Sequence, residues 1–183
     1  MSLLAALLLS GTSVELDPAW QPVENPQALA SNGQIQCLEP DVVGRTCLAM
    51  SWYKAAPGGE TRFRTVYALS NQHGLAVQTS GAVRWEGDAA CTKMDGTTFE
   101  TSFLVKLAAP HARITDRRYF LYFREEAVQA FANQNVCGRT YRHRDTGDYL
   151  SVGTINGEFA GGLMQGFSLI DAEAGYRLRA AND

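Results

Sequence analysis

The sequence lacks an excess of either charge and lacks a long hydrophobic run. Sixteen Lys and Arg residues stand against nineteen Asp and Glu residues, which leaves a formal net charge of -3 over 183 residues. Binding to nucleic acid without sequence preference needs clustered cations, so nucleic acid is not an expected partner. The longest apolar run covers residues 3–9, which is too short to cross the ~30 Å hydrocarbon core of a membrane. We therefore expect no transmembrane segment.

That apolar run has the form of part of a secretion signal. Small and polar residues follow it at positions 10–13, and an apolar stretch ended by small residues is the pattern that a signal peptidase recognises. The positively charged segment that normally precedes the apolar stretch is missing. We interpret residues 1–13 as the remnant of a signal peptide or as a leader, and expect a periplasmic or secreted bacterial protein. The alternative is a short amino-terminal helix packed on the domain.

Cysteine is scarce, and its spacing does not fit a zinc motif. The chain has four cysteines, Cys37, Cys47, Cys91 and Cys137, with no C-x-x-C pair and no histidine at zinc-finger spacing. We expect no metal and no cofactor. Four cysteines can pair in three ways, and we favour Cys37–Cys47 with Cys91–Cys137, because the first two bracket a turn-rich stretch. The alternative is four buried, reduced thiols.

The common catalytic signatures are absent or stand in the wrong context. The Asp-Thr-Gly triplet at residues 145–147 matches that of aspartic proteases, but basic residues 142–144 precede it where that chemistry needs apolar ones. A hairpin turn explains the triplet better. The sequence has no nucleophile elbow and no phosphate-binding loop. A metal site built from His73, His111 and His143 would need three distant segments to converge. We assign no catalytic residue.

One cluster of cations stands out immediately before this triplet. Arg139, Arg142, His143 and Arg144 lie within six residues of one another, and Arg117 with Arg118 could add to them. In a chain of slightly negative net charge, such a cluster predicts a local basic patch that binds an anion or a partner. The alternative is a solvated strand face.

Alternating hydrophobic and polar residues predict β-strands over much of the chain. Aromatic and β-branched side chains fall on one face at every second position, and Gly, Pro, Asn and Asp turns separate the segments, which indicates an antiparallel meander. The predicted strands are residues 47–54, 63–69, 99–107, 136–143, 149–155 and 175–178.

Residues 116–134 have helical periodicity instead. Phe120, Phe123, Ala127 and Phe131 recur at intervals of three and four, as on one face of an amphipathic helix. The alternative for its first residues is that 119–123 begin as a strand. The predicted fold class is therefore α+β, a mainly antiparallel β-sheet with this helix packed on it.

The predicted organisation has three parts. Residues 1–13 are the leader, and residues 14–33 form an arm whose three prolines favour an extended chain or a sheet edge, pinned to the body by Trp20. Residues 34–183 form a single disulfide-bonded domain.

The cysteine framework resembles that of a group of small exported bacterial proteins with no assigned activity. The resemblance covers residues 35–178, and its features are Cys37-x-x-Pro40, Arg45-Thr46-Cys47, a cysteine after a strand, Cys137-x-x-Thr140-Tyr141 and Gly175-Tyr176-Arg177-Leu178. It implies export and disulfides, and no site residues. We expect an exported, non-enzymatic domain that binds a protein or small-molecule partner or supports an envelope assembly. The alternative is an exported hydrolase whose site is assembled from dispersed residues.

Overall fold

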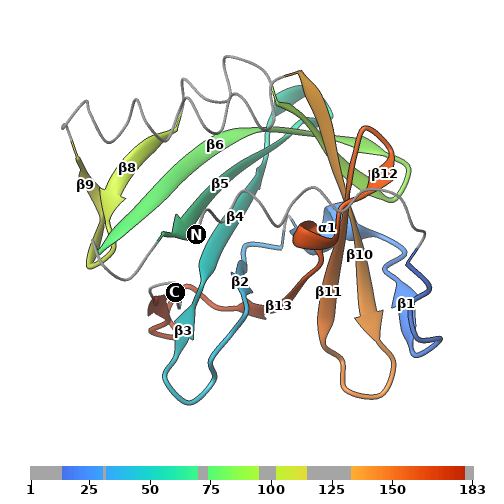
Figure 1. The fold of residues 1–183 in the computed structure, drawn as a ribbon, viewed down its shortest axis with the longest axis horizontal. Coiled ribbons are helices and arrows are strands. Elements are labelled where there is room, and N and C mark those ends of the chain that lie inside the picture. Colours follow the sequence, from blue (N-terminus) through green and yellow to red (C-terminus); the bar gives the residue numbers. More distant parts are fainter. Residues whose placement is uncertain (1–13, 31, 70–73, 95–101, 115–132, 180–183) are drawn as a thin grey trace.

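Eight antiparallel strands close into a barrel (Figure 1). The computed structural model describes residues 14–30, 32–69, 74–94, 102–114 and 133–179. Each barrel strand pairs with the next one along the ring, and the last pairs with the first, which closes it. In ring order the strands are β2 (Ile35–Leu38), β4 (Ala49–Ala55), β5 (Thr61–Ala68), β6 (Leu75–Glu86), β7 (Ala89–Met94), β10 (Gln134–His143), β11 (Tyr149–Ile155) and β13 (Gln165–Ile170).

The remaining elements extend or cover this ring. β1 pairs with the end of β10, β12 pairs with β11, and β8 with β9 continues the sheet beyond β6. β3 and β14 form a separate parallel pair. Their bounds are β1 (Trp20–Pro22), α1 (Pro26–Ala30), β3 (Thr46–Cys47), η2 (Pro57–Gly59), β8 (Phe103–Lys106), β9 (Ala109–Arg113), β12 (Glu158–Phe159), η3 (Gly161–Leu163) and β14 (Arg177–Leu178).

The α+β prediction is wrong, because the described part of the chain is nearly all β. Alternation correctly indicated antiparallel strands, but a sheet that closes on itself covers its own inner face without a layer of helix. The one α-helix in the described part of the chain is α1, five residues long, within the arm predicted to be extended. The helix predicted over 116–134 lies outside the described residues up to residue 132, and Gln134 already belongs to β10.

The strands are strongly staggered around the ring. Paired residues lead from Tyr149 through β13, β2, β4 and β5 to Val77. A second path starts at Trp85, eight residues further along β6, and runs through β7 and β10 to Gly153. The four-residue step from Gly153 back to Tyr149 runs in the same direction across the barrel as the step along β6. One circuit of the ring is therefore offset by twelve residues. An eight-stranded barrel with a stagger of eight is filled by its own side chains, and a larger stagger tilts the strands and widens the ring. The interior, here called the lumen, is therefore roomy.

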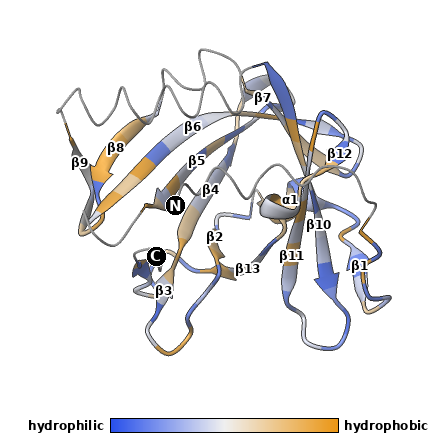
Figure 2. Ribbon diagram, in the orientation of Figure 1, coloured by the Kyte–Doolittle hydropathy of each residue, from blue (hydrophilic) through white to orange (hydrophobic). Residues whose placement is uncertain are grey.

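The main hydrophobic core lies on the outer face of the barrel. Residues on alternate positions of β2, β4, β5, β6 and β13 pack there against β3, β8 and β14. Figure 2 shows β8 as hydrophobic over most of its length. The buried members of this core are Ile35, Cys37, Cys47, Met50, Val66, Ala76, Val105, Ile170 and Leu178. The strands that enclose the lumen are thus held mainly from outside.

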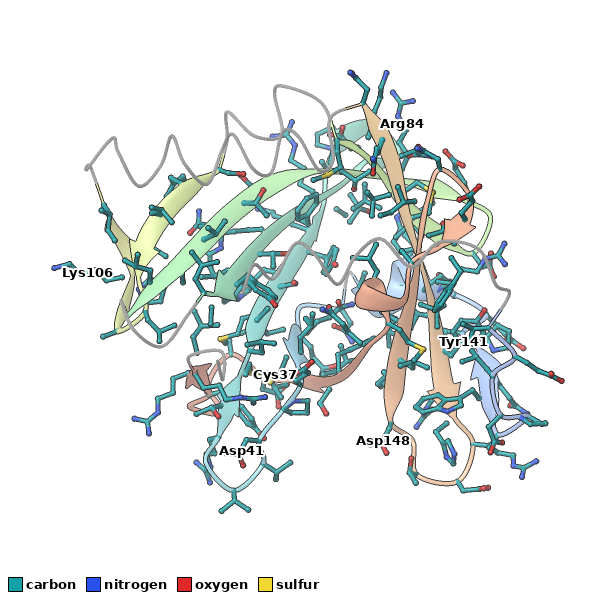
Figure 3. All side chains as sticks on the ribbon, viewed as in Figure 1. Cys37, Asp41, Arg84, Lys106, Tyr141 and Asp148 are labelled. Atoms are coloured by element: carbon teal, nitrogen blue, oxygen red, sulfur yellow. A yellow bond between two sulfur atoms is a disulfide. The ribbon has the colours of Figure 1, made fainter. Side chains whose placement is uncertain are left out.

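Both predicted disulfides are confirmed. Cys37–Cys47 joins β2 to β3 within the outer core, with its Cα atoms 5.3 Å apart (Figure 3). Cys91–Cys137 joins directly opposed residues of β7 and β10, with Cα atoms 4.0 Å apart. The second bridge therefore joins two neighbouring strands of the ring, β7 and β10, which are separated in the sequence by β8 and β9.

Candidate functional site

The lumen holds a cavity of about 400 Å³. Residues from all eight barrel strands line it, and α1 and η3 contribute Pro26, Ala30 and Leu163. Within the described part of the chain, every side chain that lines the cavity is uncharged. Because an ion buried without a counter-charge is strongly disfavoured, this lining suits a neutral molecule.

Three aromatic residues form one wall of the lumen. Tyr53 on β4, Phe63 on β5 and Trp85 on β6 all line the cavity, and the Tyr53 and Phe63 ring centroids are 6.5 Å apart. A Cβ at Gly81 would stand 3.0 Å from the Phe63 ring, so the glycine makes space for that ring. The Trp85 indole donates a hydrogen bond of 3.1 Å to the buried Thr61 hydroxyl, which fixes the indole plane.

A polar row faces this aromatic wall. Thr140 on β10 pairs with Ser151 on β11, and Ser151 pairs with Gln165 on β13. In a ring of eight, β10, β11 and β13 stand four strands away from β4, β5 and β6 and so lie across the lumen. Among the described residues, none of these three side chains has a hydrogen-bond partner. Their hydroxyl and amide groups are therefore free to bind a ligand.

Several other polar groups around the lumen are hydrogen-bonded to one another. The Ser51 and Thr65 hydroxyl oxygens are 2.8 Å apart, and the Ser102 hydroxyl donates to Thr79 Oγ1 at 2.9 Å. Burial raises the pKa of the Tyr53 phenol, and its hydrogen bond with Ser51 offsets part of that shift. The phenol therefore stays protonated at neutral pH, in keeping with an uncharged lumen.

One side of the lumen depends on a close approach of η3 to β11. A Cβ at Gly153 would collide with the Leu163 side chain, so this position leaves space for Leu163. Leu163 and Gly153 both line the cavity. The Leu163 side chain thus helps to set how much of the lumen stays open.

Two of the four residues of the predicted basic patch are ion-paired. Arg139 Nε lies 3.1 Å from Asp88 Oδ1, and Arg144 Nε lies 3.1 Å from Asp145 Oδ1. All four side chains of these pairs are well exposed to solvent. The two pairs therefore reduce the positive charge that the sequence suggested for this region.

The other two residues lie on alternate faces of β10. His143 packs its ring edge-on against Trp20, at 4.9 Å between centroids, which places the predicted Trp20 contact on β10. The Arg142 guanidinium carbon lies 5.7 Å from the centre of the Tyr149 ring. None of the four patch residues lines the lumen. That they bind an anion or a partner stays a prediction, and Arg117 and Arg118 lie outside the described residues.

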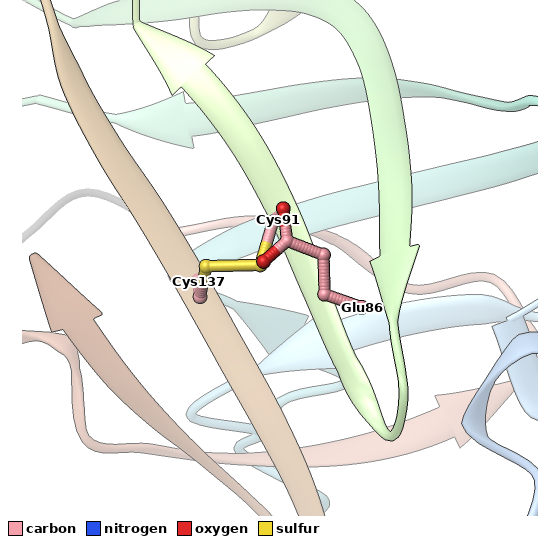
Figure 4. Close-up of side chains that lie close together, drawn as sticks. All are labelled: Glu86, Cys91 and Cys137. Atoms are coloured by element: carbon pink, nitrogen blue, oxygen red, sulfur yellow. A yellow bond between two sulfur atoms is a disulfide. The ribbon is translucent and has the colours of Figure 1, made fainter. Parts of the chain in front are cut away.

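The other candidate motifs do not form a site in the described residues. Glu86 lies beside Cys91 and Cys137, but both sulfur atoms belong to the disulfide and offer no thiolate to a metal (Figure 4). The Asp-Thr-Gly triplet falls in the turn between β10 and β11, where the Thr146 hydroxyl donates to Asp148 Oδ2 at 2.6 Å. His73 lies outside the described residues.

Sequence reasoning missed the lumen itself. The pattern at residues 63–69 was recognised as a strand face, but β2, β6, β7 and β13 were not predicted. The available signal was the repeat of Thr, Ser, Gln and aromatic residues at every second position, which marks a polar inner face rather than a core. No helix among the described residues is long and apolar enough to cross a membrane. Comparison with known proteins finds no matching family model, no matching curated protein and no matching solved structure.

Proposed function

We propose that this chain is an exported binding protein that holds one small, uncharged molecule in the lumen of its barrel. The observation that carries the proposal is the cavity of about 400 Å³, lined from all eight strands by uncharged side chains among the described residues. Eight-stranded barrels are of the size that either fills with side chains or holds one small ligand. Export is supported by the two disulfides, which are typical of oxidising compartments.

The position of the hydrophobic core supports a lumen that is open to a ligand. Because the main core lies on the outer face, the barrel does not need a filled interior to fold. At ~30 Å³ for each water, the cavity corresponds to roughly thirteen water molecules, the size of a compact organic ligand.

The hydrolase alternative has less support. Hydrolysis through a covalent intermediate needs a nucleophile beside a general base. The described lining of the lumen contains serine and threonine but neither histidine nor a carboxylate. Binding without chemistry is the simpler use of this arrangement.

A matched pair of dyes tests the proposal. N-phenyl-1-naphthylamine is uncharged, and 8-anilino-1-naphthalenesulfonate adds one sulfonate to the same skeleton. We expect the uncharged dye to bind at one site per chain, and the sulfonate to bind at least about tenfold more weakly because the lumen offers no counter-charge. Fluorescence titration measures both.

A pair of variants on β11 assigns the site. Ser151→Phe adds a ring inside the lumen, whereas Thr154→Phe adds the same ring on the outer face of the same strand. We expect only Ser151→Phe to abolish binding of the uncharged dye while the far-ultraviolet circular dichroism is kept. Thr140→Phe serves as a second lumen-filling variant if Ser151→Phe fails to fold. Saturable binding that survives both lumen variants, or no saturable binding, would refute the proposal.

A further inference from the structure

The lumen is polar on one side and aromatic on the other. The aromatic wall is Tyr53, Phe63 and Trp85, and the polar row is Thr140 with Ser151 and Gln165, four strands away around the ring. A ligand without polar groups would satisfy only the aromatic wall. A ligand polar on every side would leave polar groups unpaired against the aromatic wall, which is costly because the ligand displaces water there.

Resting on the proposed lumen function, we propose that the ligand is a planar, uncharged ring compound with at least two hydroxyl or carbonyl groups along one edge. The ring stacks against the aromatic wall, and the substituted edge faces the polar row. Aromatic faces favour offset stacking with another ring, and they need no charge on the ligand.

The polar row is built to recognise such an edge. Adjacent strands are ~4.8 Å apart, so the three side chains, one on each of three neighbouring strands, present groups at regular intervals along a line. Substituents on non-adjacent ring positions have comparable spacing. Each hydroxyl and the amide can both donate and accept, so the row accommodates hydroxyl and carbonyl groups alike.

The backbone beside this row is also accessible. Gly138 neighbours Thr140 on the inner face of β10 and pairs with Gly153. A Cβ at Gly138 would meet only the Ser151 hydroxyl oxygen, at 3.3 Å, which is slightly closer than ordinary van der Waals contact. The cavity therefore extends to the backbone at Gly138, and a flat ring can approach the row closely there.

Two isomeric probes test the proposal. In 2,7-dihydroxynaphthalene both hydroxyls lie on one long edge, whereas 2,6-dihydroxynaphthalene carries them on opposite edges; both are uncharged at neutral pH and equally apolar. We expect the 2,7 isomer to bind about five- to tenfold more tightly than the 2,6 isomer, because the second hydroxyl gains a partner only in the 2,7 isomer. Calorimetry at pH 7 on the intact, oxidised chain measures the ratio.

Substitutions then assign the preference to the polar row. Thr140→Val with Gln165→Leu removes two hydrogen-bonding groups at similar volume, and Thr154→Val is the control on the outer face. We expect the double variant to lose the isomer preference and to bind unsubstituted naphthalene as the wild type does. The control should keep the preference.

The outcomes separate the two proposals. If naphthalene binds and Ser151→Phe blocks it, but the wild type does not distinguish the isomers, the edge-recognition proposal is overturned and the lumen function stands. If neither naphthalene nor either isomer binds saturably, the proposed function fails as well. A preference unchanged by the double variant would also overturn the role of the polar row.

Discussion

The two disulfides should contribute unequally to stability, and the difference follows from where each bridge lies. Cys37–Cys47 closes a short loop with a sequence separation of 10, whereas Cys91–Cys137 closes a longer one with a separation of 46. A bridge that closes a longer loop removes more conformational entropy from the unfolded chain. The bridge at the closing strands β7 and β10 should therefore contribute more.

The loop-entropy relation gives the magnitudes. With the two sequence separations as loop lengths, it yields about 4 kcal/mol for Cys91–Cys137 and about 2.7 kcal/mol for Cys37–Cys47. Domains of this kind have free energies of unfolding of ~5–15 kcal/mol, so either loss is large enough to measure. The expected difference between the bridges is about 1.3 kcal/mol.

Reduction of one bridge at a time isolates this contribution from packing. The variant Cys37→Ala with Cys47→Ala retains only the Cys91–Cys137 bridge, and the variant Cys91→Ala with Cys137→Ala retains only the other. Each is unfolded in urea with and without dithiothreitol, so that the cost of the alanines cancels within each pair. The free energy of unfolding should fall by about 4 kcal/mol in the first variant and about 2.7 kcal/mol in the second. An equal or inverted loss would refute the reasoning.

Two further predictions concern single residues. Gly153→Ala should destabilise the fold by about 1–3 kcal/mol, because the new methyl group collides with Leu163, whereas Gly161→Ala, with 3.7 Å of clearance, should change urea unfolding much less. Burial raises the pKa of Tyr53 above its ordinary value of 10.0, so the unfolded chain ionises first as pH rises, and stability present below that value is lost above it. Tyr53→Phe should therefore lose less unfolding free energy than the wild type between about pH 9 and about pH 11.

Local pattern was sufficient to predict several strands and both bridges. The prediction for residues 149–155 agrees with β11 at both ends, and that for residues 136–143 falls short of β10 by two residues at its start. These segments carry aromatic and β-branched residues between clear turn sequences, so tertiary context did not override the local preference. The disulfide pairing was predicted because Cys37 and Cys47 bracket a turn-rich stretch, which left Cys91 and Cys137 for the second bridge.

Among the described strands the longest, β6, was not predicted because polar and small residues interrupt its alternation. Its inner face carries Val77, Val83 and Trp85, but Thr79 and Gly81 stand between them. A hydroxyl and a glycine in the middle of the inner face weaken the hydropathy contrast on which the period-two signal depends. The same feature hid the candidate site, because its residues are uncharged and belong to no motif.

Closure of the ring could not be read from local pattern. The pairing of β13 with β2 joins segments more than a hundred residues apart, and β2 is only four residues long. Glycines around residues 157–166 indicated a loop-rich region and obscured the start of β13. Without this pairing, an open sheet needs a covering layer, which led to the mistaken helix-on-sheet architecture.

The opposite faces of a single strand should separate stability from binding. On β2, Ile35 is 4% exposed in the outer core, and the adjacent Gln36 lines the lumen with no side-chain hydrogen bond among the described residues. Ile35→Ala should cost about 2–5 kcal/mol of unfolding free energy, because it leaves a cavity in a packed core. Gln36→Ala should cost no more than about 0.5 kcal/mol, since it removes no partner and no core contact, yet it should change the affinity for an uncharged lumen probe. Urea unfolding and calorimetry on the two variants measure both effects. A large loss of stability in Gln36→Ala would mean that the lumen side chains support the fold, and that the barrel interior is a core rather than a binding site.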